Sequence, residues 1–263
     1  MNTGLQGKVA LVTGGSRGIG KAIAHHLAAE GVRVAICSRD DRLLKQAADE
    51  LKVATRADII AVKANIAKMN DIHRFVETAM KKFNRIDILV NNAGGAHIGG
   101  IFQTSDEQWE YHLQLKLLGY IRMAREVIPK MKLSGGGKII NIVGMAAREP
   151  NALYMVPGVT NSALLNFTKS LSKELESDHI QVNAINPSTT ETPLTEQTIA
   201  SLAQIFQKTP DDIRQELTSS SPRGRFATPD DIAGIAVFLA SDAAGYLNGI
   251  SLNADAGRSP GLW

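Results

Sequence analysis

Short apolar runs alternate with amphipathic, helix-length stretches along the whole chain, and this alternation constrains the fold more than any other feature of the sequence. Six runs are rich in β-branched residues and apolar on both faces, which is typical of buried parallel strands. They occupy residues 9–13, 32–37, 59–62, 86–90, 138–142 and 180–185, and a weaker seventh run lies at 250–252. Because helical patterns separate these runs, the sequence predicts an α/β protein built from parallel β–α–β units with right-handed crossovers.

The helical stretches are recognised by apolar residues at helical spacing. They lie at residues 19–29, 72–83, 105–132, 162–175 and 229–239. Pro129 is expected to bend or end the third of them. Between residues 187 and 222 the alternation breaks, and two short helical patterns appear near residues 196–206 and 211–217. We therefore predict one domain, residues 1–263, with an inserted substrate lid at about 188–222.

Composition excludes several classes of function. Hydrophobic residues make up 44% of the 263 residues and charged residues 21%, as in ordinary globular proteins. The net charge of +3 is scattered along the chain, so nucleic acid is not an expected partner. No apolar run is long enough for a signal peptide or a membrane span, which predicts a cytoplasmic protein with no membrane partner. Cys37 is the only cysteine, which excludes an internal disulfide and a cysteine-rich metal site, and no metal site is predicted.

A glycine-rich turn follows the first predicted strand and leads directly into a helix. The turn reads Thr13-Gly14-Gly15-Ser16-Arg17-Gly18-Ile19-Gly20, with the spacing Gly14-x3-Gly18-x-Gly20. Glycines allow the backbone to turn tightly and to approach a pyrophosphate, whose charge the helix N-terminus stabilises. Glycine clusters also form ordinary turns, but this one lies between a strand and a helix, with a second strand beyond. The turn therefore predicts a dinucleotide site.

The end of the second predicted strand indicates which dinucleotide binds. Sites that prefer NAD place an acidic side chain here, which accepts hydrogen bonds from the adenosine ribose. This chain has Ser38 and Arg39 instead, and Arg17 is available from the glycine turn. Two guanidinium groups around a 2′-phosphate form a strong charge-assisted site, and the alternative is that both are ordinary surface arginines. Asp40 and Asp41 follow where a helix should begin, and we assign them to its N-terminal dipole. NADP(H) is the predicted cofactor.

The glycine turn is one of four motifs that resemble the short-chain dehydrogenase/reductase family over nearly the whole chain. The others are Asn91-Asn92-Ala93-Gly94 after the fourth strand, Asn186-Pro187 after the sixth, and Arg223-Gly224-Arg225-Phe226 before the last helix. The resemblance implies a Rossmann-type, doubly wound, parallel sheet of seven strands with helices on both faces. It also implies a homotetramer or homodimer, and hydride transfer to or from a carbonyl, an alcohol or an activated alkene.

The resemblance also implies which residues contact the cofactor. It places Asn92-Ala93-Gly94 beside the adenosine and the nicotinamide ribose, and Asn65 near the adenine, where the family usually has an aspartate. After Pro187 it directs Ser188, Thr189, Thr190 and Thr192 toward the nicotinamide carboxamide and the cofactor phosphate, with Thr192 as the principal contact. The full set of expected cofactor contacts is Gly14, Ser16, Arg17, Gly18, Ile19, Gly20, Ser38, Arg39, Asn65, Ile66, Asn92, Ala93, Gly94, Pro187 and Thr192.

The family's usual catalytic tetrad of Asn, Ser, Tyr and Lys is not matched at the corresponding positions, which hold Lys116, Gly144, Pro157 and Asn161. Tyr154 lies seven residues before Asn161. This arrangement is similar to the Tyr-x6-Lys of the family's enoyl-reductase branch, with asparagine in place of lysine. Residues seven apart lie on one helix face, so both side chains are expected to point into the site. The alternative for Tyr154 is an aromatic residue in a loop.

Lysine and asparagine are exchanged between positions 116 and 161, which face each other across the site in the family fold. We hypothesise that Lys116 supplies the positive charge that Asn161 lacks and lowers the pKa of Tyr154. The alternative is a surface or ribose-binding lysine. The candidate catalytic residues are therefore Tyr154, Lys116 and Asn161. His97 is either an acid–base group at the mouth of the site or a solvated loop residue.

Three functions remain open. We favour an NADP(H)-dependent oxidoreductase that reduces a ketone, enone or enoyl thioester with a non-standard active site, because Tyr154 is retained at the alternative spacing. The second function is a non-redox enzyme on the same fold, such as an isomerase or dehydratase, and the third is a catalytically inactive NADP(H)-binding protein. The apolar residues of the predicted lid favour a small-molecule substrate with a hydrophobic portion, unless they only anchor the lid; they are Leu194, Ile199, Leu202, Ile205 and Phe206.

Overall fold

The computed structural model describes residues 3–261, and its centre is a parallel sheet of seven strands. In chain order the strands are β1 (Val9–Thr13), β2 (Arg33–Ser38), β3 (Ile59–Lys63), β4 (Ile88–Asn91), β5 (Gly137–Ile142), β6 (Ile180–Pro187) and β7 (Ser251–Ala254). The α-helices are α1 (Gly18–Ala29), α2 (Asp41–Thr55), α3 (Met69–Phe83), α4 (Asp106–His112), α5 (Leu118–Leu133), α6 (Met155–Glu174), α7 (Pro193–Phe206), α8 (Pro210–Ser219) and α9 (Pro229–Ala240). None of the helices within residues 3–261 is long and apolar enough to cross a lipid bilayer.

The strands are ordered β3-β2-β1-β4-β5-β6-β7, so the direction in which the chain winds reverses between β1 and β4. This is the doubly wound, Rossmann-type arrangement, and the predicted fold class is confirmed. Such a reversal leaves a crevice beyond the carboxyl ends of the two strands, where ligands of α/β proteins usually bind. Here β1 leads into the glycine turn, and β4 ends at Asn91, just before Asn92.

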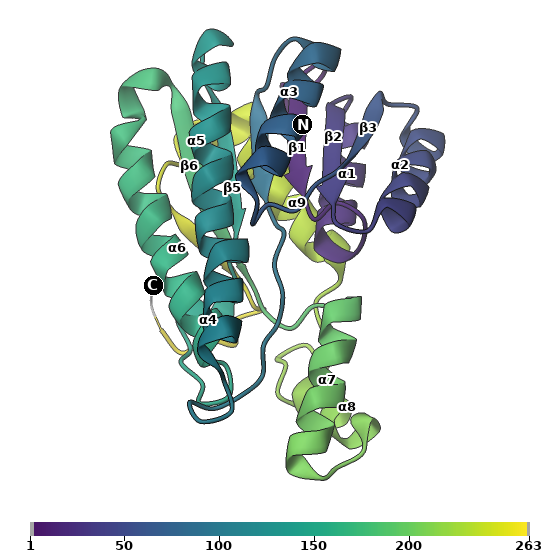
Figure 1. The fold of residues 1–263 in the computed structure, drawn as a ribbon, viewed down its shortest axis with the longest axis vertical. Helices are drawn as coiled ribbons and strands as arrows, with labels where there is room; N and C mark the ends of the chain where they lie inside the picture. The colour runs from purple at the N-terminus through teal and green to yellow at the C-terminus, as the bar shows by residue number, and fades with distance from the viewer. Residues whose placement is uncertain (1–2, 262–263) are drawn as a thin grey trace.

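Apolar side chains cover both faces of the sheet. Along β1, Val9 and Leu11 belong to one buried cluster, while Ala10 and Val12 belong to another, because successive side chains of a strand point to opposite faces. Helices α3, α5 and α6 pack in the first cluster, and helices α1, α2 and α9 pack in the second (Figure 1). Both faces of the central strands are therefore buried, which explains their uninterrupted apolar runs.

The stretch expected as one helix at residues 105–132 forms α4 and α5, joined by a π-helical turn at Leu113–Leu117. The helix does not end at Pro129, because α5 continues to Leu133. Proline removes one hydrogen bond to the preceding turn, but buried side chains of α5 before and after it pack against the sheet and hold the helix together. The interruption therefore falls at the π-helical turn, which carries Lys116.

The two short helices expected after β6 are α7 and α8, and together they form a segment that extends away from the sheet (Figure 1). We call them the α7–α8 segment. Thr192 caps α7 by accepting a hydrogen bond from the N–H of Thr195, and Thr209 begins α8 with a capping box. Ile199, Ala203 and Ile213 of the segment form a small apolar cluster with Phe226, which lies in the loop before α9.

Candidate functional site

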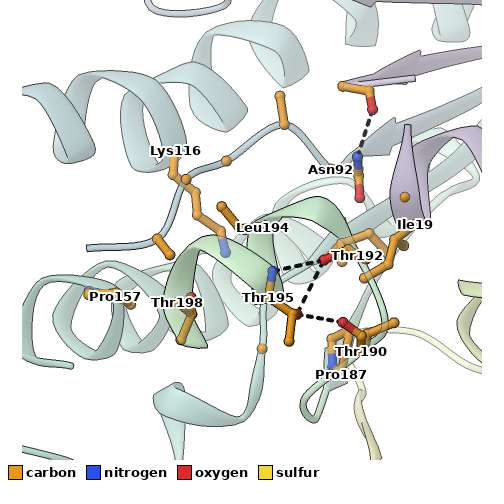
Figure 2. A pocket seen from close by; sticks show the side chains of 18 of the residues that line it. Ile19, Asn92, Lys116, Pro157, Pro187, Thr190, Thr192, Leu194, Thr195 and Thr198 are labelled. Atoms are coloured by element: carbon orange, nitrogen blue, oxygen red, sulfur yellow. Dashed lines mark hydrogen bonds between the residues drawn. The ribbon is translucent and has the colours of Figure 1, made fainter. Parts of the chain in front are cut away.

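A cavity of about 920 Å³ lies at the crevice between β1 and β4. Its wall begins at the glycine turn and the end of β2, continues along the residues that follow β4 and β5, and reaches α6 and the α7–α8 segment. Figure 2 shows part of this wall, with Asn92 and Ile19 on one side and Lys116, Pro157 and Thr198 on the other. The volume lies in the range of small-molecule and cofactor sites.

The glycine turn brings the backbone close to the cavity and to its neighbours. Gly14 has a φ of +69°, and a Cβ there would lie 2.9 Å from Asn92 Nδ2. Gly18 has a φ of +55°, and a Cβ there would lie 3.1 Å from the Thr192 methyl carbon across the cavity. Arg17 precedes the first turn of α1 without a side-chain cap, so the N–H groups of that turn remain available. This is the arrangement that binds an anion at a helix N-terminus.

Side chains at the end of β4 hold the glycine turn in place. The N–H groups of Asn92 and Ala93 donate to Thr13 Oγ1 over 2.9 and 3.0 Å, and Asn92 Nδ2 donates to the carbonyls of Thr13 and Gly14. Gly20 does not line the cavity, in contrast to the expectation, because it lies behind the turn: a Cβ there would be 2.4 Å from Asn92 Nδ2. Asn92 therefore lines the cavity, but its amide nitrogen supports the turn.

The wall beyond β2 contains the two arginines expected at the adenosine end. Arg17 and Arg39 both line the cavity and are exposed, and the half-buried Ser38 lines it beside them. Asp40 lies at the N-terminus of α2, where the sequence placed it, and caps the helix by accepting a hydrogen bond of 3.0 Å from the N–H of Leu43. Asn65 also lines the cavity, but its Oδ1 accepts a hydrogen bond of 3.1 Å from the N–H of Ala67 within its own loop.

Lys116 extends from the π-helical turn into the cavity, toward Leu194 and Thr198 of α7 (Figure 2). Its Nζ donates a hydrogen bond of 2.7 Å to the carbonyl oxygen of Val143, directly after β5. Burial disfavours the charged form and lowers the pKa of Lys116 to about 8. The cavity therefore holds an amine that changes its charge close to neutral pH.

Tyr154 is the residue before α6, and its side chain turns toward α7 rather than toward Lys116. Its hydroxyl lies 3.3 Å from Thr198 Oγ1. Burial raises the pKa of Tyr154, and the hydrogen bond to Thr198 only partly offsets this effect. The hypothesis that Lys116 lowers the pKa of Tyr154 is therefore wrong, because desolvation dominates and the ammonium bonds to Val143 instead.

Asn161 lies in α6, seven residues after Tyr154, and also lines the cavity. Its side chain is buried, with 4% of its surface exposed, and its Oδ1 accepts no hydrogen bond within residues 3–261. Gly144 is next to it, since a Cβ at Gly144 would lie 3.2 Å from Asn161 Nδ2. With φ at +122° and ψ at 152°, Gly144 occupies a backbone conformation that is essentially restricted to glycine.

The structure brings most of the expected site residues to one cavity. Apart from Gly20, every expected cofactor contact and all three candidate catalytic residues line it, as do Ser188, Thr189 and Thr190. His97 does not, because its Nε2 pairs with Thr104 Oγ1 at 2.9 Å and its ring contacts His112. Sequence reasoning missed Glu149, Asn151 and Arg258, which also line the cavity. They lie outside any motif, and only tertiary folding brings them there.

The apolar residues of the α7–α8 segment divide between the two expected roles. Leu194, Leu202 and Phe206 line the cavity. Ile199 belongs to the buried cluster of the segment, and Ile205 is exposed. Some of these residues are therefore available to a ligand, whereas others hold the segment together.

A separate group of His73, Glu77 and Glu126 lies between α3 and α5, with potential metal-ligating atoms within 4.8 Å of one another. His73 Nδ1 lies 2.9 Å from Glu126 Oε1, and Lys130 Nζ lies 3.1 Å from Glu77 Oε1. Because Lys130 already supplies a cation to this group, the side chains form an ion-pair network and we assign no metal to them.

A parallel sheet of this order, with a glycine turn and a cofactor-sized cavity at its switch point, is the arrangement of a Rossmann-type dinucleotide-binding protein. Sequence similarity places the chain among the short-chain dehydrogenases/reductases. Residues 14–259 match the model of a family described as Enoyl-(Acyl carrier protein) reductase, and the chain belongs to that family.

Curated relatives and solved structures give the same assignment. The chain is 34% identical to a 3-oxoacyl-[acyl-carrier-protein] reductase of Synechocystis sp., over 97% of this chain and 98% of that protein. The structure of L-sorbose reductase from Gluconobacter frateurii, complexed with NADPH and L-sorbose, matches with a TM-score of 0.94 and 34% identity over 100% of both chains. A 3-ketoacyl-(acyl-carrier-protein) reductase from Brucella melitensis, complexed with NADH, matches with a TM-score of 0.86 and 33% identity, over 97% of this chain and 99% of that one. The chain is thus similar to oxidoreductases along its whole length.

Proposed function

We propose that this chain is an NADP(H)-dependent reductase that reduces a carbonyl group or an activated alkene, with Lys116 as the residue that protonates the product. The observation that carries the proposal is the position of Lys116. Its ammonium group lies in the cavity and donates to Val143 O, and burial lowers its pKa to about 8. Membership of the reductase family and the NADPH complex of the similar L-sorbose reductase support the choice of reaction and cofactor.

The cavity fits the proposed cofactor at four places. Gly18 keeps the backbone open beside Thr192, where a Cβ would fill the gap between the glycine turn and α7. The uncapped first turn of α1 offers N–H groups to a pyrophosphate. The buried Oδ1 of Asn161 lacks a donor, and a hydroxyl of the nicotinamide ribose is the donor we propose for it. Arg17 and Arg39 would bind the 2′-phosphate, which NADH lacks.

When bound, NADPH supplies the hydride. As a carbonyl carbon gains that hydride, negative charge develops on its oxygen, and a nearby ammonium stabilises the charge. Lys116 then transfers one proton to the oxygen and recovers it from water, which completes the alcohol. An acid with a pKa of about 8 suits this task, since it is largely protonated at neutral pH and still releases its proton readily.

The four positions of the usual tetrad support a non-standard active site. Gly144 has a glycine-specific backbone, so it differs from the usual serine in backbone conformation as well as in side chain. Pro157 lies in the first turn of α6 and has no proton to exchange. We propose that Tyr154, whose hydroxyl bonds to Thr198, positions α7 over the substrate and does not act as the proton donor.

The lining of the cavity supports a substrate with both apolar and polar parts. Leu194, Leu202 and Phe206 provide apolar surface from the proposed lid, while Glu149 and Arg258 provide opposite charges. We propose a ketone with an apolar portion and at least one further polar group.

The test is NADPH oxidation, followed by absorbance, across a panel of substrates. The panel contains a 3-oxoacyl thioester, a ketose, a cyclic diketone, an enone and an enoyl thioester. Lys116→Met is expected to lower kcat by at least about 100-fold, the usual size of a general-acid contribution. The matched control is Lys138→Met, because Lys138 is also half-buried with a lowered pKa but does not line the cavity. Unchanged kcat in Lys116→Met would contradict the assigned role.

A cofactor-binding protein without catalysis is the second candidate. The observation that favours it is the Tyr154 hydroxyl, which is engaged with Thr198 and has a raised pKa. If NADPH binds but no compound of the panel consumes it, this function or a non-redox reaction replaces the proposed one. The expected homodimer or homotetramer is also part of the proposal, and sedimentation velocity of the purified chain measures it directly.

A further inference from the structure

One contact joins Arg39, at the end of the cavity beyond β2, to a residue outside the cavity wall. The Arg39 guanidinium donates a hydrogen bond from Nη1 to the hydroxyl of Tyr111, and its Cζ lies over the Tyr111 ring, 6.0 Å from the centroid. Arg39 directly follows β2, whereas Tyr111 belongs to α4, which follows β4. Since β2 and β4 lie on opposite sides of β1, the contact spans the crevice at the switch point.

Tyr111 is the only partner of the Arg39 side chain within residues 3–261. The neighbouring carboxylate of Asp40 is used in capping α2, where it accepts from Leu43. Arg17, the other arginine at this end of the cavity, makes no side-chain hydrogen bond or ion pair in the same part of the chain. Of the two guanidinium groups, only that of Arg39 is therefore held in position before a ligand arrives.

From these contacts we infer that Tyr111 is a positioning residue for cofactor selectivity, which holds Arg39 over the site of the adenosine 2′-phosphate. An arginine side chain has many rotamers, and a partner that orders it in advance reduces the entropy lost on binding. The contact with Tyr111 uses one of the five N–H groups of Arg39, so the others remain available to a phosphate. The Tyr111 hydroxyl accepts from Arg39 and keeps its own proton, which a phosphate oxygen can accept.

The inference rests on the NADP(H) assignment in the proposed function, and the experiment separates the two. Calorimetry measures Kd for NADPH, for 2′,5′-ADP and for NADH with the wild type, Tyr111→Phe and Tyr111→Leu. Tyr111→Leu removes both the ring and the hydroxyl. It is expected to raise Kd for NADPH and for 2′,5′-ADP by about threefold to tenfold and to change Kd for NADH by less than about twofold. Tyr111→Phe keeps the ring and is expected to show an intermediate loss for the two phosphorylated ligands.

The control is Tyr246→Leu, which removes a fully exposed tyrosine that lies outside the cavity. Because 42% of Tyr111 is exposed, the variants are expected to fold, and their melting temperatures check this. Equal weakening of NADPH and NADH, or no change in either, overturns the role of Tyr111. If the wild type itself binds NADH more tightly than NADPH, the cofactor assignment fails and the inference falls with it.

Discussion

At the scale of single residues, burial shifts the pKa values of two titratable groups that line the cavity in opposite directions. It lowers the pKa of Lys116 to about 8 and raises the pKa of Tyr154. The charged form is disfavoured in both cases, but the lysine becomes a stronger acid and the tyrosine a weaker one. Near neutral pH, Lys116 is therefore the better proton donor, which reverses the relation expected for a tyrosine activated by a neighbouring lysine.

The first prediction concerns the pH dependence of reduction. The protonated form of Lys116 is the active acid, so kcat/KM for NADPH-dependent reduction should be level below pH 7 and fall as the pH rises through about 8. In Lys116→Arg the guanidinium stays charged and hardly releases its proton, so the rate should be low and this fall should disappear below pH 10. Initial rates between pH 6 and pH 10 measure the effect. A profile of the wild type that stays level through pH 9 contradicts the assignment.

The second prediction concerns Gly144. Serine at this position must adopt a φ of +122° with its Cβ 3.2 Å from Asn161 Nδ2, which should lower the free energy of unfolding by about 1–3 kcal/mol. Gly144→Ser should also fail to increase turnover, although it adds the hydroxyl that the family usually has. Urea denaturation of Gly144→Ser and of the control Gly234→Ser measures the difference, since a Cβ at Gly234 meets no atom within 4 Å. Equal stability of the two variants rules out strain at Gly144.

At the scale of elements, contacts between segments that are distant in sequence place the helices that carry the site. The π-helical turn at Leu113–Leu117 puts Lys116 into the cavity, and α7 brings Thr198 to the Tyr154 hydroxyl. Both contacts join segments that are distant in sequence. The hydrogen bond between Thr198 and Tyr154 therefore connects the proposed lid to the start of α6, and mutation of Thr198 can test this connection.

The third prediction tests this connection. Thr198→Val keeps the branched shape of the side chain but removes the hydroxyl that lies 3.3 Å from the Tyr154 oxygen. We expect KM for the ketone to rise by about twofold to tenfold, the value of one hydrogen bond, while Kd for NADPH stays unchanged. Ser201→Ala is the control on the same helix, because the Ser201 hydroxyl bonds to Gln197 O within its own helix. A rise in KM of the same size in both variants refutes the specific role of Thr198.

The elements themselves could be predicted well from the sequence, and the reason is physical. Strands buried on both faces give continuous apolar runs. The spacing of the glycines in the turn after β1 is typical of a backbone that approaches a ligand closely. The π-helical turn could not be predicted, because residues 113–117 carry no local signal and the turn depends on packing between α4, α5 and α6. Likewise, Arg258 and Tyr111 reach the cavity region through tertiary folding, from segments that show no binding motif.

The direction of the side chains was the least predictable part of the site. Asn92 was expected to contact the cofactor, but its amide nitrogen is used to hold the glycine turn. Lys116 was expected to lower the pKa of Tyr154, but the Tyr154 hydroxyl bonds to Thr198 of α7. Sequence spacing fixes the side of a helix on which a residue lies, whereas hydrogen bonds with distant segments decide where the side chain points.

At the scale of the whole molecule, the cavity lies where three apolar clusters meet. The two faces of the sheet provide two of them, and the α7–α8 segment provides the third, which is small and has few buried residues. Elements with few buried contacts open most easily. A ligand that fills the cavity contacts both the glycine turn and α7. Its binding energy should therefore stabilise the closed position of the α7–α8 segment.

The fourth prediction follows from this arrangement and is measured by hydrogen exchange with and without saturating NADPH. Protection should increase most in the glycine turn and in residues 193–219, which line or carry the cavity wall. In α3, which contributes no residue to that wall, protection should rise by no more than the gain in global stability. At 100 times Kd, NADPH adds about 2.7 kcal/mol to global stability, which corresponds to a rise in Tm of roughly 5–10 °C for a chain of this length. NADH at the same concentration should give a smaller effect, because Arg17 and Arg39 gain no phosphate. Protection that rises equally in α3 and in residues 193–219 means that NADPH acts only through global stability, and the α7–α8 segment is then not a lid.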